Sequence, residues 1–470
     1  MKILFINKFL SKGAINREPL GILSLSSAIA DKHKVFILEP ARDNIDQKIK
    51  SIKPDVIAYS IRTSYHKYYI DLNRELKSKY KFVSIFGGPH ATLFPDMINE
   101  KGVDCICRGE GEEALLEFLD TLENKGDITK VRNLWVKKNK KIYQNPVRPL
   151  IQDLDQLRFP DRSLLDGYRE IKSSKVKNFI TGRGCPYACS YCFNAGFRKI
   201  YFGQNYVRKR SVGNIINEIK GVKNKYGIEI AILDDDTINI NKKWLLEFCK
   251  QFKTLGIKFI CIGIRADLVD ENTVRSLKNS HCIGVVFGIE SGNETVRREI
   301  LNRYMSNKQI IACAKLFKKY RINYTTENIL GIPTTSLEND LETLKLNVIC
   351  KPMYSNAHIM QPYPSTGIFE FAVKKGLYKQ RNFDDLNDFF IESKMRIENK
   401  YERENLQRLF SLAVRFPFIY FHIRWLIRLP LRYFYDIIFN IYKVYIGINW
   451  MPSKRSLQEY PSLFRRYFFG

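Results

Sequence analysis

Three cysteines within eight residues form the part of this sequence best suited to do chemistry. In the segment GRGCPYACSYC (182–192), three residues separate Cys185 from Cys189, and two separate Cys189 from Cys192. Thiolates at such spacing can bind one metal centre from a single loop. A structural zinc ion needs four ligands, and no fourth Cys or His lies close by in the sequence. Three thiolates instead suit a cluster of four irons and four sulfides with one iron left open to an amine and a carboxylate.

The same segment resembles the signature of the radical S-adenosylmethionine (radical SAM) enzymes, including the aromatic Tyr191 before the last cysteine. The resemblance implies that the reduced cluster cleaves S-adenosylmethionine to methionine and a 5′-deoxyadenosyl radical. Such clusters reach potentials down to about −700 mV, so the reducing power is attainable. A thioredoxin-like pair of Cys189 and Cys192, or plain buried thiols, would leave Cys185 unexplained.

Strand candidates surround the cysteines at regular intervals. They lie at 178–184, 229–235, 258–265, 284–290, 323–331 and 355–361. The helical segments between them begin near residues suited to N-caps, which are Ser211, Asn241, Asp270, Ser306 and Ser336. Six strand–helix units predict a partial (βα)6 barrel of the TIM type, with its site at the carboxyl ends of the strands.

Those strand ends carry polar residues and turns. Asp234, Asp235 and Asp236 close the second strand, and the resemblance implies that this end faces the amino group of the bound methionine moiety. The residues expected to bind S-adenosylmethionine are Tyr191, Asp234, Asp235, Asp236, Arg265, Glu290, Ser291, Gly331 and Pro333. Two loops depart from the pattern of relatives, GIPTTS at 331–336 and PYPST at 362–366. These departures change how closely the backbone approaches the adenosine.

The first 120 residues alternate short apolar runs with amphipathic segments. The runs at 2–6, 34–40, 55–60, 81–88 and 104–107 are too short for helices and predict buried parallel strands. The segments at 21–32, 43–53, 65–80, 91–101 and 111–124 predict helices. This alternation predicts a doubly wound, Rossmann-like sheet that binds ligands at the carboxyl ends of its strands.

Two segments at these strand ends, IFGGPHAT (85–92) and CRGEGEEAL (107–115), resemble the cobalamin-binding domain of one branch of the radical SAM superfamily. The residues that the resemblance assigns to cobalamin are Ser60, Thr63, Gly87, Gly88, His90, Gly109 and Glu110. Glycine lets the backbone approach a nucleotide tail, and His90 is expected to be structural or to contact that tail. The loop NKFLSKG (7–13) lacks the histidine that ligates cobalt in many such domains, so no imidazole is expected below the cobalt.

The chain divides into four regions. We expect a cobalamin-binding domain at 1–125, a connector with a small hairpin at 126–170, the radical SAM barrel at 171–375 and a helical region at 376–470. Within the last region, 409–450 is rich in aromatic and aliphatic residues broken by arginines. It predicts either a helical cap over the barrel mouth or an element at a membrane surface. No nucleic-acid motif accompanies the charge, so no nucleic acid is expected as a partner.

The amino-acid composition indicates which binding partners and which cellular compartment to expect. Lysine and arginine number 77 against 49 acidic residues, a formal net charge of +28, which is either spread over solvated faces or meets an anionic partner. Ten cysteines and an apolar run too short for a signal peptide favour a reducing compartment. We expect a cytoplasmic monomer, with or without peripheral contact with the inner face of the membrane.

Together these features predict a cobalamin-dependent radical SAM enzyme that methylates an unactivated carbon of a small or lipid-like substrate. An external donor of the flavodoxin or ferredoxin type would supply electrons, and no catalytic residue beyond the cofactors is expected. The alternatives are cobalamin-assisted cyclisation or rearrangement without methyl transfer, and a non-catalytic membrane-surface binding protein on a degenerate fold. Methylthio transfer to RNA is disfavoured, because those relatives hold three more cysteines where this chain has only Cys105 and Cys107, which are expected in the core.

Overall fold

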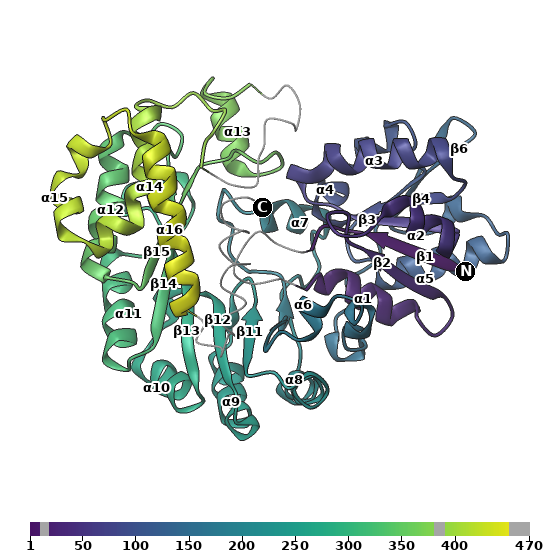
Figure 1. The fold of residues 1–470 in the computed structure, drawn as a ribbon, viewed down its shortest axis with the longest axis horizontal. Coiled ribbons are helices and arrows are strands. Elements are labelled where there is room, and N and C mark those ends of the chain that lie inside the picture. Colours follow the sequence, from purple (N-terminus) through teal and green to yellow (C-terminus); the bar gives the residue numbers. More distant parts are fainter. Residues whose placement is uncertain (10–17, 380–390, 451–470) are drawn as a thin grey trace.

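The computed structural model describes residues 1–9, 18–379 and 391–450 of the chain. Two mainly parallel sheets lie side by side, each covered by helices, and the carboxyl-terminal helices pack beside the second sheet (Figure 1). Within the described ranges, no helix combines the length and apolar character needed to cross a membrane.

The first sheet has seven strands in the order β2-β1-β3-β4-β5-β6-β7. They are β1 (Lys2–Ile6), β2 (Lys34–Leu38), β3 (Val56–Ser60), β4 (Val83–Gly87), β5 (Cys105–Cys107), β6 (Leu134–Lys138) and β7 (Lys141–Gln144). The first five are parallel, as the short apolar runs predict. The strand order reverses between β1 and β3, and doubly wound sheets bind ligands at such a point.

Helices cover both faces of this sheet. They are α1 (Leu20–Ile29), α2 (Ile45–Ile52), α3 (His66–Lys79), α4 (Gly88–Leu93) and α5 (Glu112–Glu123). The α1 and α5 helices pack over one face and the other three over the opposite face, so two apolar cores flank the sheet. The α4 helix is shorter than predicted, because Pro95 cannot continue an α-helix and begins a 3₁₀ turn instead.

The hairpin predicted within the connector belongs to the first sheet. The β6 strand pairs antiparallel with β5, joining Val136 to Cys105 and Leu134 to Cys107, and β7 pairs with β6. The hairpin thereby covers the edge of β5, whose backbone groups would otherwise lack partners. The chain then reaches the second sheet through turns and the short α6 helix (Arg169–Lys172).

The second sheet is the partial six-stranded barrel predicted from the sequence. Its parallel strands, adjacent in chain order, are β8 (Val176–Phe179), β11 (Ile230–Asp234), β12 (Lys258–Ile264), β13 (Cys282–Glu290), β14 (Asn323–Leu330) and β15 (Tyr354–Ile359). The outer helices are α8 (Val212–Tyr226), α9 (Lys242–Phe252), α10 (Glu271–Asn279), α11 (Asn307–Lys319) and α12 (Leu337–Cys350). Each begins after its predicted N-cap residue.

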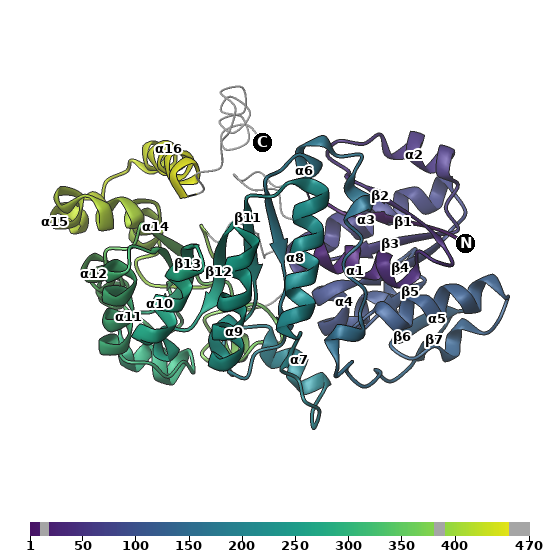
Figure 2. The same ribbon diagram turned by 90° about the horizontal axis from the view of Figure 1, so that it is seen from below.

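The carboxyl-terminal region is helical, as predicted, within its described residues. Its helices are α14 (Lys400–Arg415), α15 (Pro417–Leu426) and α16 (Arg432–Trp450), and the short α13 helix (Gly367–Lys374) precedes the region. The α14 helix packs on β15 and α12, where Leu406 and Phe410 meet Ala357 and Ile359. It is therefore the sixth outer helix of the barrel. The α16 helix packs on α14. It lies on the opposite side of the sheet from the helices α9, α10 and α11 (Figures 1 and 2).

Candidate active site

The three cysteines lie in the loop between the short strand β9 (Gly182–Arg183) and α7 (Asn194–Ile200). Three thiolates on one loop suit a cluster in which each sulfur binds a different iron, which leaves the fourth iron without a protein ligand.

Residues on the far side of the barrel hold this loop. The buried Arg303 places Nη1 3.9 Å from Sγ of Cys189, and its Nη2 donates a hydrogen bond to the Gly288 carbonyl at 2.9 Å. Asn302 donates to the carbonyl of Ala188 at 2.7 Å. These contacts join the cysteine loop to the turn that follows β13.

The other two cysteines have polar neighbours of their own. Sγ of Cys185 lies 3.2 Å from Oγ1 of Thr237, and Nδ2 of Asn194 donates to Sγ of Cys192 at 3.6 Å. Burial raises the pKa of Cys192 to about 11. A thiolate at that position therefore needs a nearby positive charge, which iron supplies.

Tyr191 of the cysteine loop interacts with Glu290 at the end of β13. Glu290 ends β13 with a positive φ of 65°, and burial raises the pKa of its carboxyl, with Arg303 and Tyr191 opposing that shift. A side chain at Gly288 would collide with this carboxylate, since its Cβ would lie 2.0 Å from Oε1. The glycine thus lets Glu290 fold back towards Arg303.

The three aspartates after β11 have different surroundings. Asp235 is buried and accepts hydrogen bonds from the Thr181 N–H at 2.7 Å and from Lys209 Nζ at 2.9 Å. Its carboxylate therefore ties β11 to the start of the cysteine loop. Asp234 and Asp236 line a cavity, and burial raises the pKa of Asp236.

Three other residues predicted to bind S-adenosylmethionine have protein partners. Arg265 makes two 3.0 Å contacts with Asp267, and its guanidinium lies 3.5 Å from the ring centroid of Tyr187 in the cysteine loop. The Ser291 carbonyl accepts a hydrogen bond from the guanidinium of Arg297, and both residues are buried. The Gly331 N–H donates to Asp340 at 3.1 Å. These contacts position the rim of the barrel.

Asp340 itself is paired with a helix of the carboxyl-terminal region. Its Oδ2 lies 3.1 Å from Arg403 on α14, and both side chains are buried. Arg403 also donates to the Thr335 carbonyl in the turn that contains Pro333. The α14 helix thereby fixes the loop after β14, which the sequence did not indicate.

A cavity of about 440 Å³ lies between the two sheets. On the first sheet it is lined by the ends of β3, β4 and β5, and on the second by the cysteine-loop strand, α7 and the end of β11. The predicted cobalamin residues among its lining are Ser60, Gly87, Gly88, Gly109 and Glu110. The loop at 7–13, which lacks a histidine to ligate cobalt, lies partly outside the described residues.

The remaining two predicted cobalamin residues do not line the cavity. His90 is buried and stacks on His66 with ring centroids 4.8 Å apart, and its Nδ1 lies 3.3 Å from Oγ1 of Thr63. Burial lowers the pKa of His90 to about 3, so its imidazole is neutral. These contacts agree with a structural position for His90.

The two glycines after β4 differ in the space around them. Gly88 has a φ of 87°, and a Cβ there would lie 2.8 Å from the Ile61 nitrogen, so only glycine fits. A Cβ on Gly87 would meet its nearest atoms at 3.9 Å, which is ordinary contact. The cavity side of Gly87 is thus open to a ligand.

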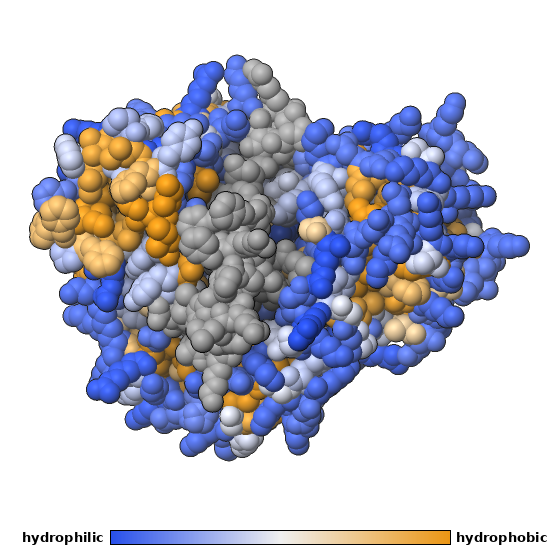
Figure 3. Space-filling view, in the orientation of Figure 1, coloured by the Kyte–Doolittle hydropathy of each residue, from blue (hydrophilic) through white to orange (hydrophobic). Residues whose placement is uncertain are grey.

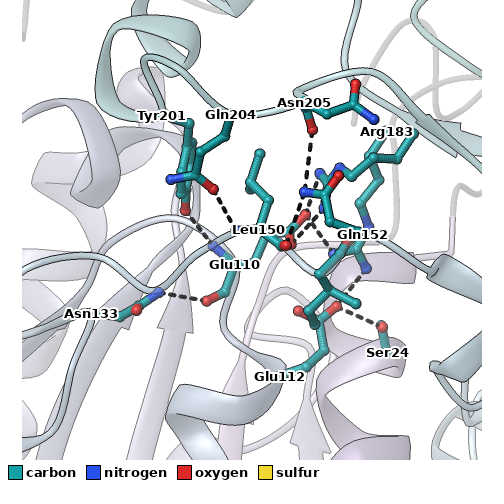
Figure 4. Close-up of polar contacts among 12 residues, drawn as sticks. Ser24, Glu110, Glu112, Asn133, Leu150, Gln152, Arg183, Tyr201, Gln204 and Asn205 are labelled. Atoms are coloured by element: carbon teal, nitrogen blue, oxygen red, sulfur yellow. Dashed lines mark hydrogen bonds and ion pairs between the residues drawn. The ribbon is translucent and has the colours of Figure 1, made fainter.

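Glu110 connects the first sheet to the barrel (Figure 4). Its carboxylate accepts from Arg183 at 2.9 Å and from Arg208 at 2.7 and 2.9 Å, and its N–H donates to the Tyr201 hydroxyl. Burial alone would raise the pKa of Glu110, but the two arginines outweigh it and lower the pKa. Sequence reasoning missed Arg183, although it directly precedes the cysteine loop.

The interior of the barrel has an apolar and a polar half. Val176, Ile230, Ile232 and Ile260 form the apolar cluster. On β14 and β15, Glu327 Oε2 lies 3.0 Å from Nε2 of His358 and accepts from Asn356 Nδ2 at 3.0 Å. None of these three polar residues was predicted, because their partners meet only when neighbouring strands pair.

Comparison with known protein families decides the assignment. Residues 179–346 match the radical SAM superfamily model, and residues 15–119 match that of the B12 binding domain. The chain contains a radical SAM domain preceded by a B12-binding domain. The first match covers the cysteine loop and the barrel strands β11 to β14, and the second covers the parallel strands β2 to β5 of the first sheet. This radical SAM enzyme uses a [4Fe–4S] cluster, S-adenosylmethionine and cobalamin.

Curated relatives are 23% to 28% identical to it over their aligned residues. An uncharacterised methyltransferase of Pyrococcus horikoshii is 28% identical over 78% of this chain and 80% of its own length. The anaerobic magnesium-protoporphyrin IX monomethyl ester cyclase of Rubrivivax gelatinosus is 26% identical over 70% of this chain and 60% of its own length. A more distant relative, the hopanoid C-3 methylase of Methylococcus capsulatus, is 23% identical over 59% of this chain and 58% of its own length.

A solved structure shares the fold. The radical S-adenosylmethionine methyltransferase TsrM from Kitasatospora setae, with cobalamin and a [4Fe–4S] cluster bound, superposes with a TM-score of 0.66 at 14% identity. The superposition covers 81% of this chain and 79% of TsrM. The predicted fold class is thereby confirmed, namely a doubly wound sheet, a partial barrel and carboxyl-terminal helices.

Proposed function

We propose that this radical SAM enzyme transfers a methyl group to an unactivated carbon of a small or lipid-like substrate. One observation carries the proposal: a single cavity is lined by Gly87 and Gly88 of the first sheet and by Asp234 and Asp236 of the barrel. Ligands of the two domains can therefore meet in one space. The methyltransferases among the relatives support methyl transfer as the outcome.

The protein's own residues hold and orient the reactants. Bound by the cysteine loop, the cluster would supply the electron that cleaves S-adenosylmethionine, and cobalamin the methyl-carrying chemistry. Cys185, Cys189 and Cys192 would hold three irons, with Arg303 in contact with the sulfur of Cys189. Asp234 and Asp236 would accept hydrogen bonds from the methionine amino group.

Other predicted site residues take a positioning function in this proposal. Asp235 and Arg265 keep the cysteine loop in place through Thr181 and Tyr187. Glu110 holds the first sheet against the barrel and shapes the cavity without offering a free carboxylate. We propose that Ser60 and Gly87 contact the cobalamin tail.

The substrate proposal follows from the barrel interior. An apolar cluster faces the polar group of Glu327, Asn356 and His358, which suits a substrate with a hydrocarbon body and a polar end. Such molecules reside in membranes, so the proposal includes peripheral contact of a monomeric chain with a lipid surface through 409–450. An electron donor of the flavodoxin or ferredoxin type would reduce the cluster.

Isotope transfer tests this function. The enzyme, reconstituted anaerobically with iron, sulfide and cobalamin, is incubated with a reductant, trideuteromethyl-labelled S-adenosylmethionine and fractionated lipid extract. Mass spectrometry should find the label in an apolar product only when cobalamin is present. A preparation without cobalamin and one lacking the three cysteines serve as controls.

The cyclase relative supports a second outcome. If 5′-deoxyadenosine accumulates while a product loses hydrogen and carries no deuterium, the enzyme cyclises or rearranges its substrate and methyl transfer is wrong.

A further inference from the structure

The α15 helix is apolar on the side that faces solvent. Phe418, Phe421 and Trp425 are 72%, 78% and 61% exposed, and their spacing of three and four residues places them along one stripe. The opposite side of the same helix packs into the core through Ile423. The solvent-facing stripe therefore contributes nothing to the described core.

The α16 helix has the same two-sided character. Tyr435, Tyr442 and Ile446 pack against α14, while the other side remains exposed. The large exposed residues on it are Tyr433, Phe434, Ile437, Ile441 and Tyr445. Figure 3 shows the two helices as an apolar area at the upper left of the molecule, and monomeric proteins rarely expose such an area without a partner.

Positive charge accompanies this apolar surface. Between 409 and 450 the sequence has five lysines and arginines and a single acidic residue, Asp436, which pairs with Arg408. Two of the five pair with acidic residues elsewhere in the chain, since Arg424 contacts Glu338 and Arg432 contacts Glu392. Arg415 and Arg428 are exposed at the two ends of α15. Aromatic side chains interspersed with arginines suit the boundary between lipid headgroups and acyl chains.

We propose that the exposed faces of α15 and α16 form a lipid-docking surface that lies on an anionic bilayer. The aromatic stripe would enter the headgroup region, and Arg415 and Arg428 would contact lipid phosphates. A symmetric contact with a second copy would bring the same cations together, which is unfavourable. The helices lie on the surface, because neither spans a bilayer.

The position of this surface links it to the barrel. The ring of Tyr442 on α16 lies 6.3 Å from that of Tyr354, which begins β15. His358 and Asn356 of the same strand face the barrel interior beside Glu327. A lipid held at α16 therefore lies next to the last strand of the barrel, and its relevance to the substrate rests on the proposed function.

Vesicle flotation of the full chain tests the docking surface without any catalytic readout. We expect the protein to float with vesicles of phosphatidylcholine and phosphatidylglycerol, and less with phosphatidylcholine alone or at high salt. The variant Phe418→Ser/Phe421→Ser/Trp425→Ser should bind at least about tenfold more weakly, or about 1.4 kcal/mol. The matched control Phe202→Ser removes a 92% exposed aromatic residue far from these helices and should bind like the wild type.

Further measurements separate the remaining outcomes. Arg415→Glu/Arg428→Glu should lose binding to anionic vesicles while keeping the wild-type melting temperature. The proposal is overturned if the wild type does not float, if the triple variant floats equally well, or if light scattering shows a dimer that the triple variant dissociates. Normal flotation without methylated product would leave the docking surface intact and contradict only the proposed function.

Discussion

The residues at the cysteine loop differ in how well the sequence alone predicts them. Cys185, Cys189 and Cys192 could be recognised because their spacing along one loop is itself the chemical requirement. Arg303 could not, because it reaches Cys189 across 114 residues of chain. Glu327 and His358 were missed for the same reason, since strand pairing brings them together. Local spacing can thus be read directly, whereas contacts made by folding cannot.

Replacement of Gly87 tests the cobalamin side of the cavity at the residue scale. We expect Gly87→Leu to fold, because the glycine has an extended backbone and its Cβ position is open. The leucine side chain would occupy space on the cavity side, so the purified variant should bind much less cobalamin with unchanged iron content. Cobalamin and iron are measured spectroscopically in the same preparation.

The control for this substitution is Gly213→Ala. Gly213 lies in α8 with no neighbour within 4 Å of its Cβ position, so alanine should leave both cofactors in place and stabilise the helix by up to about 1 kcal/mol. If Gly87→Leu and the wild type bind equal amounts of cobalamin, this part of the cavity does not belong to the cobalamin site.

At the scale of helices and strands, the local sequence determines most boundaries. Five barrel helices begin where Ser, Asn or Asp could cap them, since capping depends on neighbours within one turn. The pairing of β6 with β5 was not predictable, because alternation shows that a strand exists but not which edge it joins. The packing of α14 on β15 was not predictable either, since about forty residues of chain separate the two elements.

The capping box of α11 provides a test at this scale. Ser306 accepts from the Gln309 N–H at 3.2 Å, and the Gln309 side chain accepts from the Ser306 N–H at 2.8 Å. Ser306→Ala should lower the free energy of unfolding by about 1 kcal/mol in urea denaturation. Ser78→Ala, on the exposed side of α3, should change it by less than about 0.5 kcal/mol. Equal values for the two variants would show that the box does not stabilise α11.

At the scale of the whole molecule, buried ion pairs hold the two sheets together. Arg162 pairs with Glu18 and with Glu218 of α8, and Lys177 of β8 also pairs with Glu18. A second group joins Glu110 to Arg183 and Arg208 next to the cavity. Removing one partner of a buried pair leaves an uncompensated charge, which is strongly destabilising. The cavity therefore depends on charge pairing between the two domains.

Acid titration of Glu110→Gln tests this dependence. Because the folded-state pKa of Glu110 is lowered, its contribution to stability is present above the ordinary glutamate pKa of about 4.3 and is lost as the pH falls through the lower folded value. The variant should melt at a lower temperature than the wild type at pH 7. The expected loss in the free energy of unfolding is about 3 kcal/mol. The difference should shrink below pH 4.

The neighbouring Glu113→Gln is the matched control, because the Glu113 carboxylate is 63% exposed and lies 3.7 Å from Arg148. Thermal unfolding followed by circular dichroism should show almost no change for it. If Glu110→Gln and Glu113→Gln melt alike at pH 7, the ion pairs of Glu110 do not hold the domains.

The most direct test of the account is the amount of 5′-deoxyadenosine that the anaerobically reconstituted protein forms from S-adenosylmethionine and a reductant. The wild type and Cys249→Ala, which alters a buried core thiol, should both form it. The variant Cys185→Ala/Cys189→Ala/Cys192→Ala should bind little iron and form none above a blank without protein. Equal amounts from the triple variant and the wild type, or none from the iron-loaded wild type, would contradict a radical SAM site at these cysteines.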